Sequence, residues 1–388
     1  MSVEWIKVPL TEYIEINPKE TLLKSTIAKK IAMDKLQPFM RDVPSFEYES
    51  FSGGTKFRNG DTIMARITPC LENGKTAIVN VLDENEVGFG STEYIVFRAK
   101  EGLTTPDYVY YLVCSSLVRE PAIKSMVGSS GRQRVQTDVV ANLKILFPSI
   151  IEQEKIASIL KTLDDKIAIN NQINHNLEKQ ALTLFRSWFI NFEPFSEDGT
   201  MPSLWSTGYV SDIIELHDSR RIPLSGSERD KMEKVYPYYG ATSLMDYVDN
   251  YLFDGIYLLL GEDGTVIDSL GFPILQYVYG KFWVNNHAHI LTGKRGYSVE
   301  ELYLFFRLTN IRSIVTGAVQ QKVSQANLKK VPAVLPPEDC LHAFDELIQP
   351  LFAQIRNLRN ESNRLTQLRD ALLPKLMSGE LDVSEVDI

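Results

Sequence analysis

Two short loops carry residue types that can contact nucleic acid, and they recur at equivalent places in the chain. The first reads Gly128-Ser-Ser-Gly-Arg-Gln-Arg134, and the second reads Thr316-Gly-Ala-Val-Gln-Gln-Lys322. Backbone amides and cations in such loops can hold phosphates, while Gln and Arg side chains can hydrogen-bond to base edges. One loop alone would as readily be an ordinary surface loop. Because the same polar chemistry occurs twice, the sequence favours DNA contact.

The candidate DNA-binding residues come from these loops and from polar positions beside the strands expected nearby. In the first half of the chain they are Ser129, Ser130, Arg132, Gln133 and Arg134, with Arg66, Asn73 and Lys75 as weaker candidates. In the second half they are Gln320, Gln321 and Lys322, with Glu262, Asn286 and His287 as weaker candidates. Side chains of these kinds donate or accept hydrogen bonds or carry charge.

None of the usual catalytic motifs is present in the sequence. There is no GxxxxGK[ST] phosphate loop, which argues against NTP hydrolysis by this chain. Methyl transfer to a base amino group would suggest an Asn/Asp-Pro-Pro-aromatic loop, but Asn17-Pro18 is followed by Lys19 and Glu20. No Ser-His-Asp or Cys-His grouping is found among only five histidines. We therefore predict a non-catalytic chain, and a fused methyltransferase is a disfavoured alternative.

Two features could hold a metal ion, and the sequence favours neither. GEDG at residues 261–264 has glycines at both ends and only two acids, which is more typical of a turn. His287 and His289 alternate on one face of an expected strand and could share a metal. Without a third ligand in view, such a pair is usually structural. The sequence therefore predicts no metal site.

Length and composition are those of a globular, multidomain protein. At 388 residues the chain is too long for one ordinary core, so two or three domains are expected. It has no apolar run of membrane-spanning length, and its N-terminus lacks a signal-peptide pattern, so we expect a cytoplasmic protein without membrane contact. Cys70, Cys114 and Cys340 stand far apart, which argues against a disulfide framework and favours small buried residues.

The net charge of −9 argues against a protein that coats nucleic acid indiscriminately, but the charge is unevenly spread. Residues 117–147 hold five basic and two acidic residues, and residues 310–332 hold four basic residues and no acidic one. On charge alone, two local basic segments fit confined contact with a polyanion and solvated surface equally well.

The elements that must position the loops are repeated along the chain. Residues 133–189 align without a gap with residues 321–377, a displacement of 188 residues. A weaker match opens each half, where Trp5 aligns with Trp205 at an offset of 200. Chance is a poor explanation for the long ungapped match, so we predict that one architecture occurs twice.

Each copy of the repeat ends in a long helix with the spacing of a coiled coil. Seam residues recur at alternating steps of four and three from residue 156 in the first copy and residue 344 in the second. The residues expected to pair the helices are Ile156, Leu160, Leu163, Ile167, Asn170 and Leu177 in the first, and Ile348, Leu351, Ile355, Leu358 and Leu365 in the second. Asn170, Asn174 and Ser362 interrupt the seam, and a buried Asn fixes register at some cost in stability.

The two helices could pair with each other, or each could lie separately on its own globular domain. Their shared register favours pairing. Helices of roughly 38 residues would span about 57 Å at 1.5 Å per residue and would hold two domains at a fixed distance. Pro350 predicts a kink or a fresh helix start, and Pro374 predicts fraying near the end of the second helix.

The expected fold class is α+β, with two tandem globular domains separated by two long antiparallel coiled-coil helices and related by a pseudo-two-fold repeat. Short strand patterns with turns, followed by helical patterns, support the mixed class. The expected segments are a globular domain at 1–150, a helix at 151–192, a linker at 193–203, a second globular domain at 204–337, and a helix with an acidic tail at 338–388. The linker is polar and contains Pro and Gly, as domain boundaries commonly do.

Several longer strings, taken as a set, carry a family resemblance. They are LKILFPSIIEQEKIASILKTLDDKIAINNQINHNLEKQALTLFRSWFINFEP in the first half, LKKVPAVLPP and LTQLRDALLPKLMSGELDV in the second, and FRNGDTIMARITPCLENGKTA and YLFDGIYLLLGEDG in the globular parts. With these strings the sequence resembles the specificity subunits of type I restriction-modification systems over essentially its whole length. The segment after Pro336, PPEDCLHAFDELIQPLF, is less like the family pattern, which leaves the start of the second helix open.

The resemblance implies a function in sequence recognition. Each globular domain would be a target recognition domain that reads one half of a split, asymmetric site in double-stranded DNA, and the helices would fix the spacer. Two modification (methyltransferase) subunits would dock on the helices, and restriction subunits would join them. S-adenosylmethionine, ATP and magnesium would belong to those partners, with no cofactor in this chain. The alternative is a non-enzymatic coiled-coil adaptor that binds protein partners.

Overall fold

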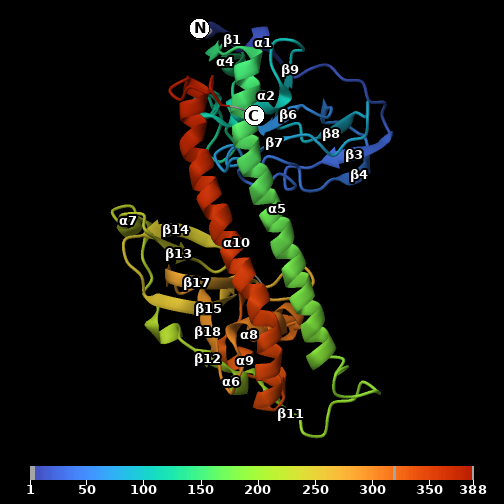
Figure 1. The fold of residues 1–388 in the computed structure, drawn as a ribbon, viewed down its shortest axis with the longest axis vertical. Helices are drawn as coiled ribbons and strands as arrows, with labels where there is room; N and C mark the ends of the chain where they lie inside the picture. Colours follow the sequence, from blue (N-terminus) through green and yellow to red (C-terminus); the bar gives the residue numbers. More distant parts are fainter. Residues whose placement is uncertain (1–4, 318–319, 387–388) are drawn as a thin grey trace. The chain divides into compact units, whose positions relative to one another are not determined.

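The computed structural model describes residues 5–317 and 320–386, which divide into two compact units. Unit 1 comprises the described residues of Met1–Asn171 and Asn360–Ile388, and unit 2 comprises those of Gln172–Arg359. Each unit therefore combines a globular part with segments of both long helices (Figure 1). The segment boundaries expected from the sequence stay predictions.

Unit 1 is a mixed α+β unit with strands in three small sheets. Its elements before the long helix are β1 (Ile6–Pro9), α1 (Leu10–Tyr13), β2 (Ile14–Ile16), β3 (Ile27–Ile31), β4 (Glu47–Ser50), β5 (Thr55–Phe57), β6 (Thr62–Ala65), β7 (Thr76–Ile78), β8 (Gly88–Gly90), β9 (Tyr94–Ala99), α2 (Pro106–Cys114), α3 (Ser116–Lys124), α4 (Thr137–Ala141) and β10 (Lys144–Phe147). The sheets run β2-β9-β6-β7, β4-β3-β8-β5 and β1-β10. Ile95 and Phe97 of β9 face the core that holds α2, while Val96 belongs to a second core with Phe57, because successive strand residues point to opposite faces.

Unit 2 is built around one larger sheet. Its elements outside the long helices are β11 (Ser206–Tyr209), α6 (Val210–Ile213), β12 (Ile214–Leu216), η1 (Asp218–Arg220), α7 (Gly226–Arg229), β13 (Tyr236–Tyr239), β14 (Leu244–Val248), β15 (Phe253–Gly261), β16 (Asp263–Gly264), β17 (Leu275–Val284), β18 (Ala288–Gly293), α8 (Val299–Leu308), η2 (Arg312–Ile314), β19 (Gln321–Lys322), α9 (Gln325–Leu328) and β20 (Pro332–Leu335). The main sheet runs β12-β18-β15-β17-β13-β14, and β16-β19 and β11-β20 form two-stranded sheets. Leu258 and Leu260 of β15 face the core that contains α8, whereas Leu259 packs on the other face.

The predicted repeat is confirmed by the opening and closing elements of the two globular parts. A strand, a short helix and a second strand follow one another as β1-α1-β2 in unit 1 and β11-α6-β12 in unit 2. The backbone N–H of Leu10 donates to Leu143 O at 2.8 Å, and that of Val210 donates to Val331 O at 2.8 Å. These pairs stand at the offsets of 200 and 188 predicted from the sequence, so the weaker opening match is also a true structural repeat.

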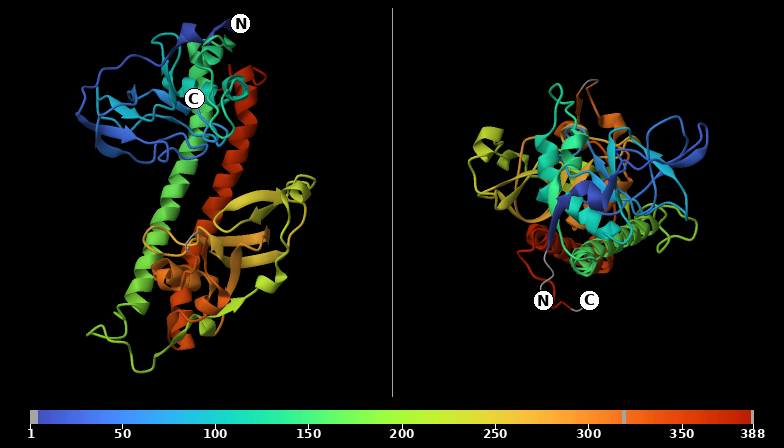
Figure 2. Two further views of the ribbon diagram at one scale, coloured as in Figure 1. Left: turned by 180° about the vertical axis from the view of Figure 1, so that it is seen from behind. Right: turned by 90° about the horizontal axis from the view of Figure 1, so that it is seen from above.

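The long helices are α5 (Ile150–Phe189) and α10 (Glu338–Ser378), and their packing confirms the predicted pairing. In unit 1, Ile156 and Leu160 near the start of α5 share a core with Leu376 and Met377 near the end of α10. In unit 2, residues near the end of α5 share a core with residues near the start of α10. The helices are therefore antiparallel within each unit. They also belong to the globular cores, so the pairing and the domain-helix alternatives are combined in one arrangement (Figure 2).

The seam between the helices mixes apolar and polar contacts. Of the residues expected to pair the helices, Ile156, Leu160, Asn170, Ile348, Ile355 and Leu358 are buried, and Leu163, Ile167, Leu177, Leu351 and Leu365 are partly buried. Asn170 is fully buried, and its Nδ2 donates to Glu361 Oε2 at 2.7 Å and to Ser362 Oγ at 3.4 Å. Asp164 of α5 and Arg369 of α10 form a buried ion pair at 2.7 Å.

A kink or a fresh helix start was expected at Pro350; the fresh start is wrong, because α10 runs as one helix from Glu338 to Ser378, and the kink stays a prediction. The expected fraying at Pro374 is also wrong, since the helix continues past that residue. Both prolines are exposed. A proline removes one internal hydrogen bond, and on an exposed face water can satisfy the carbonyl that loses its donor.

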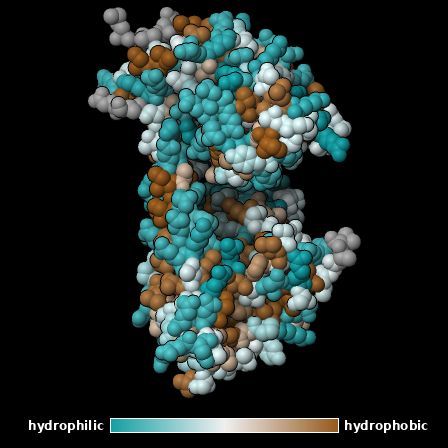
Figure 3. Space-filling model, turned by 90° about the vertical axis from the view of Figure 1, so that its right-hand side faces the viewer, coloured by the Kyte–Doolittle hydropathy of each residue, from teal (hydrophilic) through white to brown (hydrophobic). Residues whose placement is uncertain are grey.

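The surface carries small groups of hydrophobic residues among hydrophilic ones on the face shown in Figure 3. Within the described part of the chain, none of the helices combines the length and apolar character needed to cross a membrane. Cys70, Cys114 and Cys340 are free thiols and are partly buried, slightly less enclosed than expected.

Candidate nucleic-acid interface

Loop 1, defined as residues 128–134, is closed and anchored by backbone hydrogen bonds in unit 1. Val127 and Arg134 exchange N–H to carbonyl bonds of 3.0 and 2.9 Å across the base of the loop. The N–H of Thr68 donates to Gln133 O at 3.0 Å, and the N–H of Val135 donates to Arg66 O at 2.8 Å. The loop is thus tied to the segment that follows strand β6.

Loop 2, defined as residues 316–322 with 318 and 319 outside the described residues, is anchored in the same manner in unit 2. Thr316 and Lys322 exchange backbone bonds of 2.9 and 2.8 Å. Strand β19 pairs with β16, which places Gln321 opposite Gly264. The N–H of Val323 then donates to Glu262 O at 2.8 Å. Each unit therefore holds its loop against the end of a buried strand of its sheet.

Both loops need glycine at one position for their backbone geometry. Gly128 has φ +136° and Gly317 has φ +87°, a region that other residues rarely adopt. A side chain at Gly317 would also clash with the carbonyl of Gln320, and one at Gly128 would press on the carbonyl of Arg132. Gly128 and Gly317 thus each allow a tight turn that another residue would strain.

The strand ends bring weaker candidates to the loops. Arg66 N donates to Glu93 O at 2.9 Å, and Glu262 N donates to His287 O at 2.8 Å. Since Val135 pairs with Arg66 and Val323 pairs with Glu262, these two residues hold equivalent places in the two units. The structure therefore joins Arg66 to loop 1, and joins Glu262 and His287 to loop 2.

The predicted residues of loop 1 are mostly open to solvent. Ser129, Ser130, Arg132 and Arg134 are exposed and Gln133 is partly buried. Arg134 forms an ion pair with Glu93 at 2.7 Å. Among the described residues, the Arg132 side chain has no hydrogen-bond or ion-pair partner, so its guanidinium group is available to a ligand.

The predicted residues of loop 2 and its surroundings are also accessible. Gln320, Lys322, Asn286 and His287 are exposed and Gln321 is partly buried. Lys322 Nζ lies 3.5 Å from Glu262 Oε1, and His287 Nδ1 contacts Asp263 Oδ1. An open polar groove lies beside the loop and is lined by Gly264, Thr265, Ile267, Asp268, Ser269, Arg312, Gln320 and Gln321.

Three weaker candidates of unit 1 behave differently from the loop residues. Arg66 is partly buried, and its Nη2 donates to Val135 O at 3.0 Å. Lys75 donates to Met33 O at 2.8 Å, which uses its ammonium group inside the unit. Asn73 is exposed, and no contact among the described residues links it to loop 1. Whether these three touch DNA stays a prediction, but Arg66 clearly supports the loop backbone.

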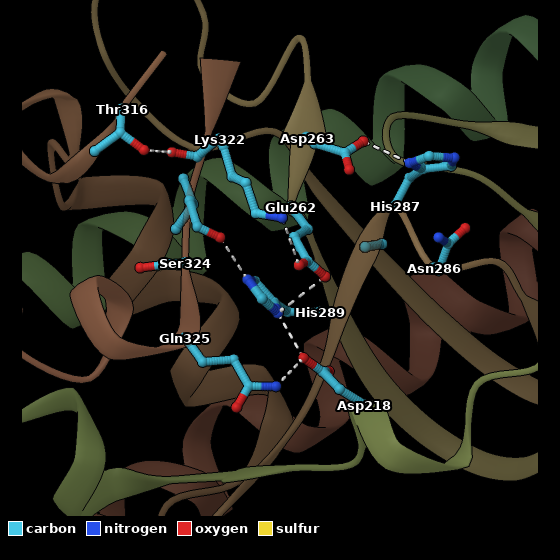
Figure 4. A network of polar contacts seen from close by, with 12 residues as sticks. Asp218, Glu262, Asp263, Asn286, His287, His289, Thr316, Lys322, Ser324 and Gln325 are labelled. Carbon is cyan, nitrogen blue, oxygen red and sulfur yellow. Dashed lines mark hydrogen bonds and ion pairs between the residues drawn. The ribbon is translucent and has the colours of Figure 1, made fainter. Parts of the chain in front are cut away.

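A buried network around His289 supports loop 2 (Figure 4). His289 is fully buried on β18, with Nδ1 at 2.6 Å from Asp218 Oδ2 and Nε2 at 2.8 Å from Val323 O. Gln325 Nε2 donates to Asp218 Oδ2 at 2.6 Å, and the N–H of Ile290 donates to Asp218 Oδ1 at 2.9 Å. The sheet order β12-β18-β15 brings these groups together from distant parts of the sequence.

Charges in the network are balanced. Arg221 Nη1 pairs with Glu262 Oε2 at 2.6 Å, and Arg221 Nη2 lies 3.5 Å from Asp218 Oδ2. Burial by itself raises the pKa of Asp218, but the hydrogen bond from His289 and the nearby positive charges outweigh it and leave that pKa below its ordinary value. The Asp218 carboxylate is therefore held ionised as an acceptor.

Asp218, Glu262 and His289 place ligand atoms within 4.8 Å of one another, a spacing that could suit a metal ion. We interpret the group as an ion-pair network instead. Both ring nitrogens of His289 face oxygen acceptors, and Arg221 and Lys322 already compensate the carboxylates. A divalent cation would add charge where cations already lie. His287 does not join His289, because it contacts Asp263 instead.

Sequence reasoning missed the residues that support the loops from behind. Glu93, Asp218, Arg221 and Gln325 were not among its candidates, and His289 was considered only as a metal ligand. No motif spacing identifies them, because strand pairing and not sequence distance brings them to the loops. Of these residues, only His289 could have been found from the sequence, by looking for a histidine within an apolar strand pattern near a predicted loop.

Exposed cations lie close in sequence to both loops. Among the described residues, Arg132 and Lys144 in unit 1 and Lys329 and Lys330 in unit 2 are exposed without an ion-pair partner. Together with Gln and Ser side chains and free loop surface, they provide donors for phosphate oxygens and donor–acceptor groups for base edges. The site is thus equipped for binding to a polyanion.

Comparison with known proteins matches this arrangement. The family described as "Type I restriction modification DNA specificity domain" matches residues 2–179 and again residues 202–367. The MjaIX specificity subunit of a type I restriction enzyme from Methanocaldococcus jannaschii is 29% identical over 318 residues, covering 74% of this chain and 71% of that protein. The HindI specificity subunit from Haemophilus influenzae is 22% identical over 84% of this chain and 87% of its own length.

A solved structure shares the fold. The S subunit of a type I restriction-modification system from M. genitalium superposes with a TM-score of 0.52 at 16% identity, with 96% of each chain covered. The family match spans most of the sequence, and it occurs twice, as the repeat of strand, loop and helix requires. The chain therefore belongs to the family of type I restriction-modification DNA specificity domains.

Proposed function

We propose that this chain is the specificity subunit of a type I restriction-modification complex and that each unit reads one half of a bipartite site in double-stranded DNA. The observation that supports this proposal most directly is that both units contain the same kind of anchored polar loop. In each unit a loop that presents Arg, Lys, Gln or Ser is tied by equivalent backbone bonds to the end of a sheet strand. Membership of a family of DNA specificity domains, whose match occurs twice in this chain, explains why such an accessible loop is present twice.

Loops 1 and 2 are anchored by equivalent backbone hydrogen bonds but present different side chains. Loop 1 carries Arg132, Gln133 and Arg134, while loop 2 carries Gln320, Gln321 and Lys322. Because different patterns of hydrogen-bond donors and acceptors select different base pairs, these two loops suit an asymmetric two-part DNA target. Linking two modest readers multiplies specificity, since binding of one raises the effective concentration of the other.

The proposed chain has no catalytic role of its own. Modification subunits would dock on α5 and α10, restriction subunits would complete the assembly, and the helices would set the spacer between half-sites. S-adenosylmethionine, ATP and magnesium would then be bound by those partners in the cytoplasm. We also propose that this chain itself binds neither a metal ion nor a cofactor.

Selection from randomised duplex DNA tests this function. The full chain is mixed with its modification subunit, bound duplexes are recovered and sequenced, and the chain alone serves as the control. We expect the complex to select a motif of two short parts separated by a fixed gap. Selection of no motif, together with stable binding of the modification subunit, would instead support a protein-binding adaptor.

A further inference from the structure

One backbone carbonyl in each unit receives a side-chain N–H from behind the loop. In unit 1 it is Val135 O, which accepts from Arg66 Nη2 at 3.0 Å. In unit 2 it is Val323 O, which contacts His289 Nε2 at 2.8 Å. A carbonyl only accepts hydrogen bonds, so His289 must present an N–H at that nitrogen. Val135 and Val323 are equivalent in the repeat, and both are buried.

We propose that Arg66 and His289 are positioning residues that fix the ends of loop 1 and loop 2 and thereby set how sharply each unit distinguishes bases. This inference rests on the proposed function. Val135 directly follows Arg134, and Val323 directly follows Lys322, so each clamped carbonyl lies one residue from the loop. A hydrogen bond to a base edge weakens steeply when its donor moves or turns, so a loosened loop end loses discrimination first.

Arg66 and His289 hydrogen-bond to equivalent carbonyls, although the two residues do not align with each other in the repeat. The structural equivalent of Arg66 is Glu262, because each accepts the backbone N–H of the clamped valine. His289 instead comes from the neighbouring strand β18, so in unit 2 a histidine makes the contact that an arginine makes in unit 1. The carboxylate at position 262 cannot donate to Val323 O, so a donor from another strand is required.

Each clamp is itself held in place. His289 Nδ1 faces Asp218 Oδ2 at 2.6 Å, and Asp218 is fixed in turn by Gln325 and by the N–H of Ile290. Arg66 is held through its own backbone, which bonds to Glu93 and to Val135. Arg66 Nε is buried without a hydrogen-bond partner among the described residues, so the Val135 carbonyl is the acceptor that orients this side chain.

Hydrogen exchange tests the clamp without any DNA. The variants are His289→Phe, which keeps a ring without an N–H donor, and Arg66→Met, both in the full chain, and Tyr303→Phe is the matched control. That control removes a partly buried hydrogen bond of 2.6 Å to Glu178 elsewhere in unit 2. We expect His289→Phe to speed exchange at the amides of Thr316 and Lys322, and Arg66→Met to do so at Val127 and Arg134. Unchanged exchange at these amides would overturn the clamp.

Half-site selection tests its consequence. In complexes with the modification subunit, we expect His289→Phe to lower base discrimination about tenfold at one half-site only, which corresponds to the loss of roughly one base contact. Arg66→Met is expected to do the same at the other half-site, and Tyr303→Phe at neither. Equal losses at both half-sites, or no loss, would overturn the inference. If the wild-type complex selects no motif, the proposed function fails while the exchange result still decides the clamp.

Two further measurements guard against a misfolded variant or a metal ligand role. Gln325→Ala loosens the Asp218 carboxylate that aligns His289, and Gln325 is only partly buried. Gln325→Ala should give a smaller loss of base discrimination than His289→Phe, at the same half-site. Stoichiometric Zn²⁺ binding to the wild-type chain that disappears in His289→Phe would overturn the inference, because the His289 ring would then be a metal ligand and not a hydrogen-bond donor.

Discussion

Replacing Glu301 with glutamine should stabilise unit 2 increasingly as pH rises. Glu301 is the third residue of helix α8 and completes a capping box with Ser298, whose backbone N–H donates to Glu301 Oε2 at 2.7 Å. The residue is fully buried, and its Oε1 has no hydrogen-bond partner among the described residues. Burial raises its pKa from 4.5 to about 8, against the lowering effect of the Ser298 hydrogen bonds.

The sign and size follow from that shift. Below about pH 4.5 the carboxyl is protonated in both folded and unfolded chains, so it adds no pH dependence. As pH rises further, the unfolded chain ionises while the folded chain keeps its proton, and the free energy of unfolding falls until pH passes about 8. Each pKa unit is worth about 1.36 kcal/mol, so the rise from 4.5 to about 8 gives a full loss on the order of 5 kcal/mol. Glutamine keeps the carbonyl acceptor and cannot ionise.

Urea unfolding at several pH values measures the difference. Three of the four tryptophans, Trp188, Trp205 and Trp283, lie in unit 2, so tryptophan fluorescence reports mainly on that unit. The control is Glu228→Gln, which alters the capping box of α7 at an exposed position where hydrogen bonds from Ser225 lower the carboxyl pKa. We expect only Glu301→Gln to gain stability between about pH 5 and 8. A pH-independent loss for this variant would refute the reasoning.

Three further changes probe the helices and the loops. Arg369→Leu should lower the stability of unit 1 by about 3 kcal/mol in urea unfolding because it leaves the Asp164 carboxylate buried without its partner; the double variant with Asp164→Leu should regain most of that loss, and a purely additive result would contradict a direct pair. Asn170→Leu should raise the melting temperature, since it replaces a buried polar group in the helix seam, and a lower melting temperature would show that its contact with Glu361 dominates. Arg132→Ala should weaken DNA binding by the complex at both specific and random sequences and reduce the salt slope by about one; an unchanged slope would mean that Arg132 does not meet a phosphate.

The helices and the repeat were predictable because their signals are local or periodic. An ungapped register and a three-four spacing give the length of α5 and α10 and their pairing without knowledge of the rest of the fold. The fresh start at Pro350 and the fraying at Pro374 were misjudged although the seam spacing leaves both prolines off the buried face, because a proline on an exposed face removes only one internal hydrogen bond. Pro350 interrupts one hydrogen bond on a wet face, and the surrounding seam keeps α10 continuous.

The loops were predictable and their supports were not. Arg132 and Gln321 stand out as polar residues in glycine-containing segments that recur. By contrast, His289 meets Asp218 and Val323 only because β18 lies between β12 and β15, a strand order that residue patterns do not encode. Arg66 shows the same limit. Its type suggests a DNA contact, which stays a prediction, and residue patterns do not encode its hydrogen bond to the Val135 carbonyl.

Exchange of one globular part tests the central claim most directly. Residues 1–150 are replaced by the corresponding part of another specificity subunit, the complex with the modification subunit is assembled, and its methylated sites are mapped across a genome. We predict that one half-site changes while the other half-site is retained. A change in both half-sites, or in neither, would contradict the account of two independent readers.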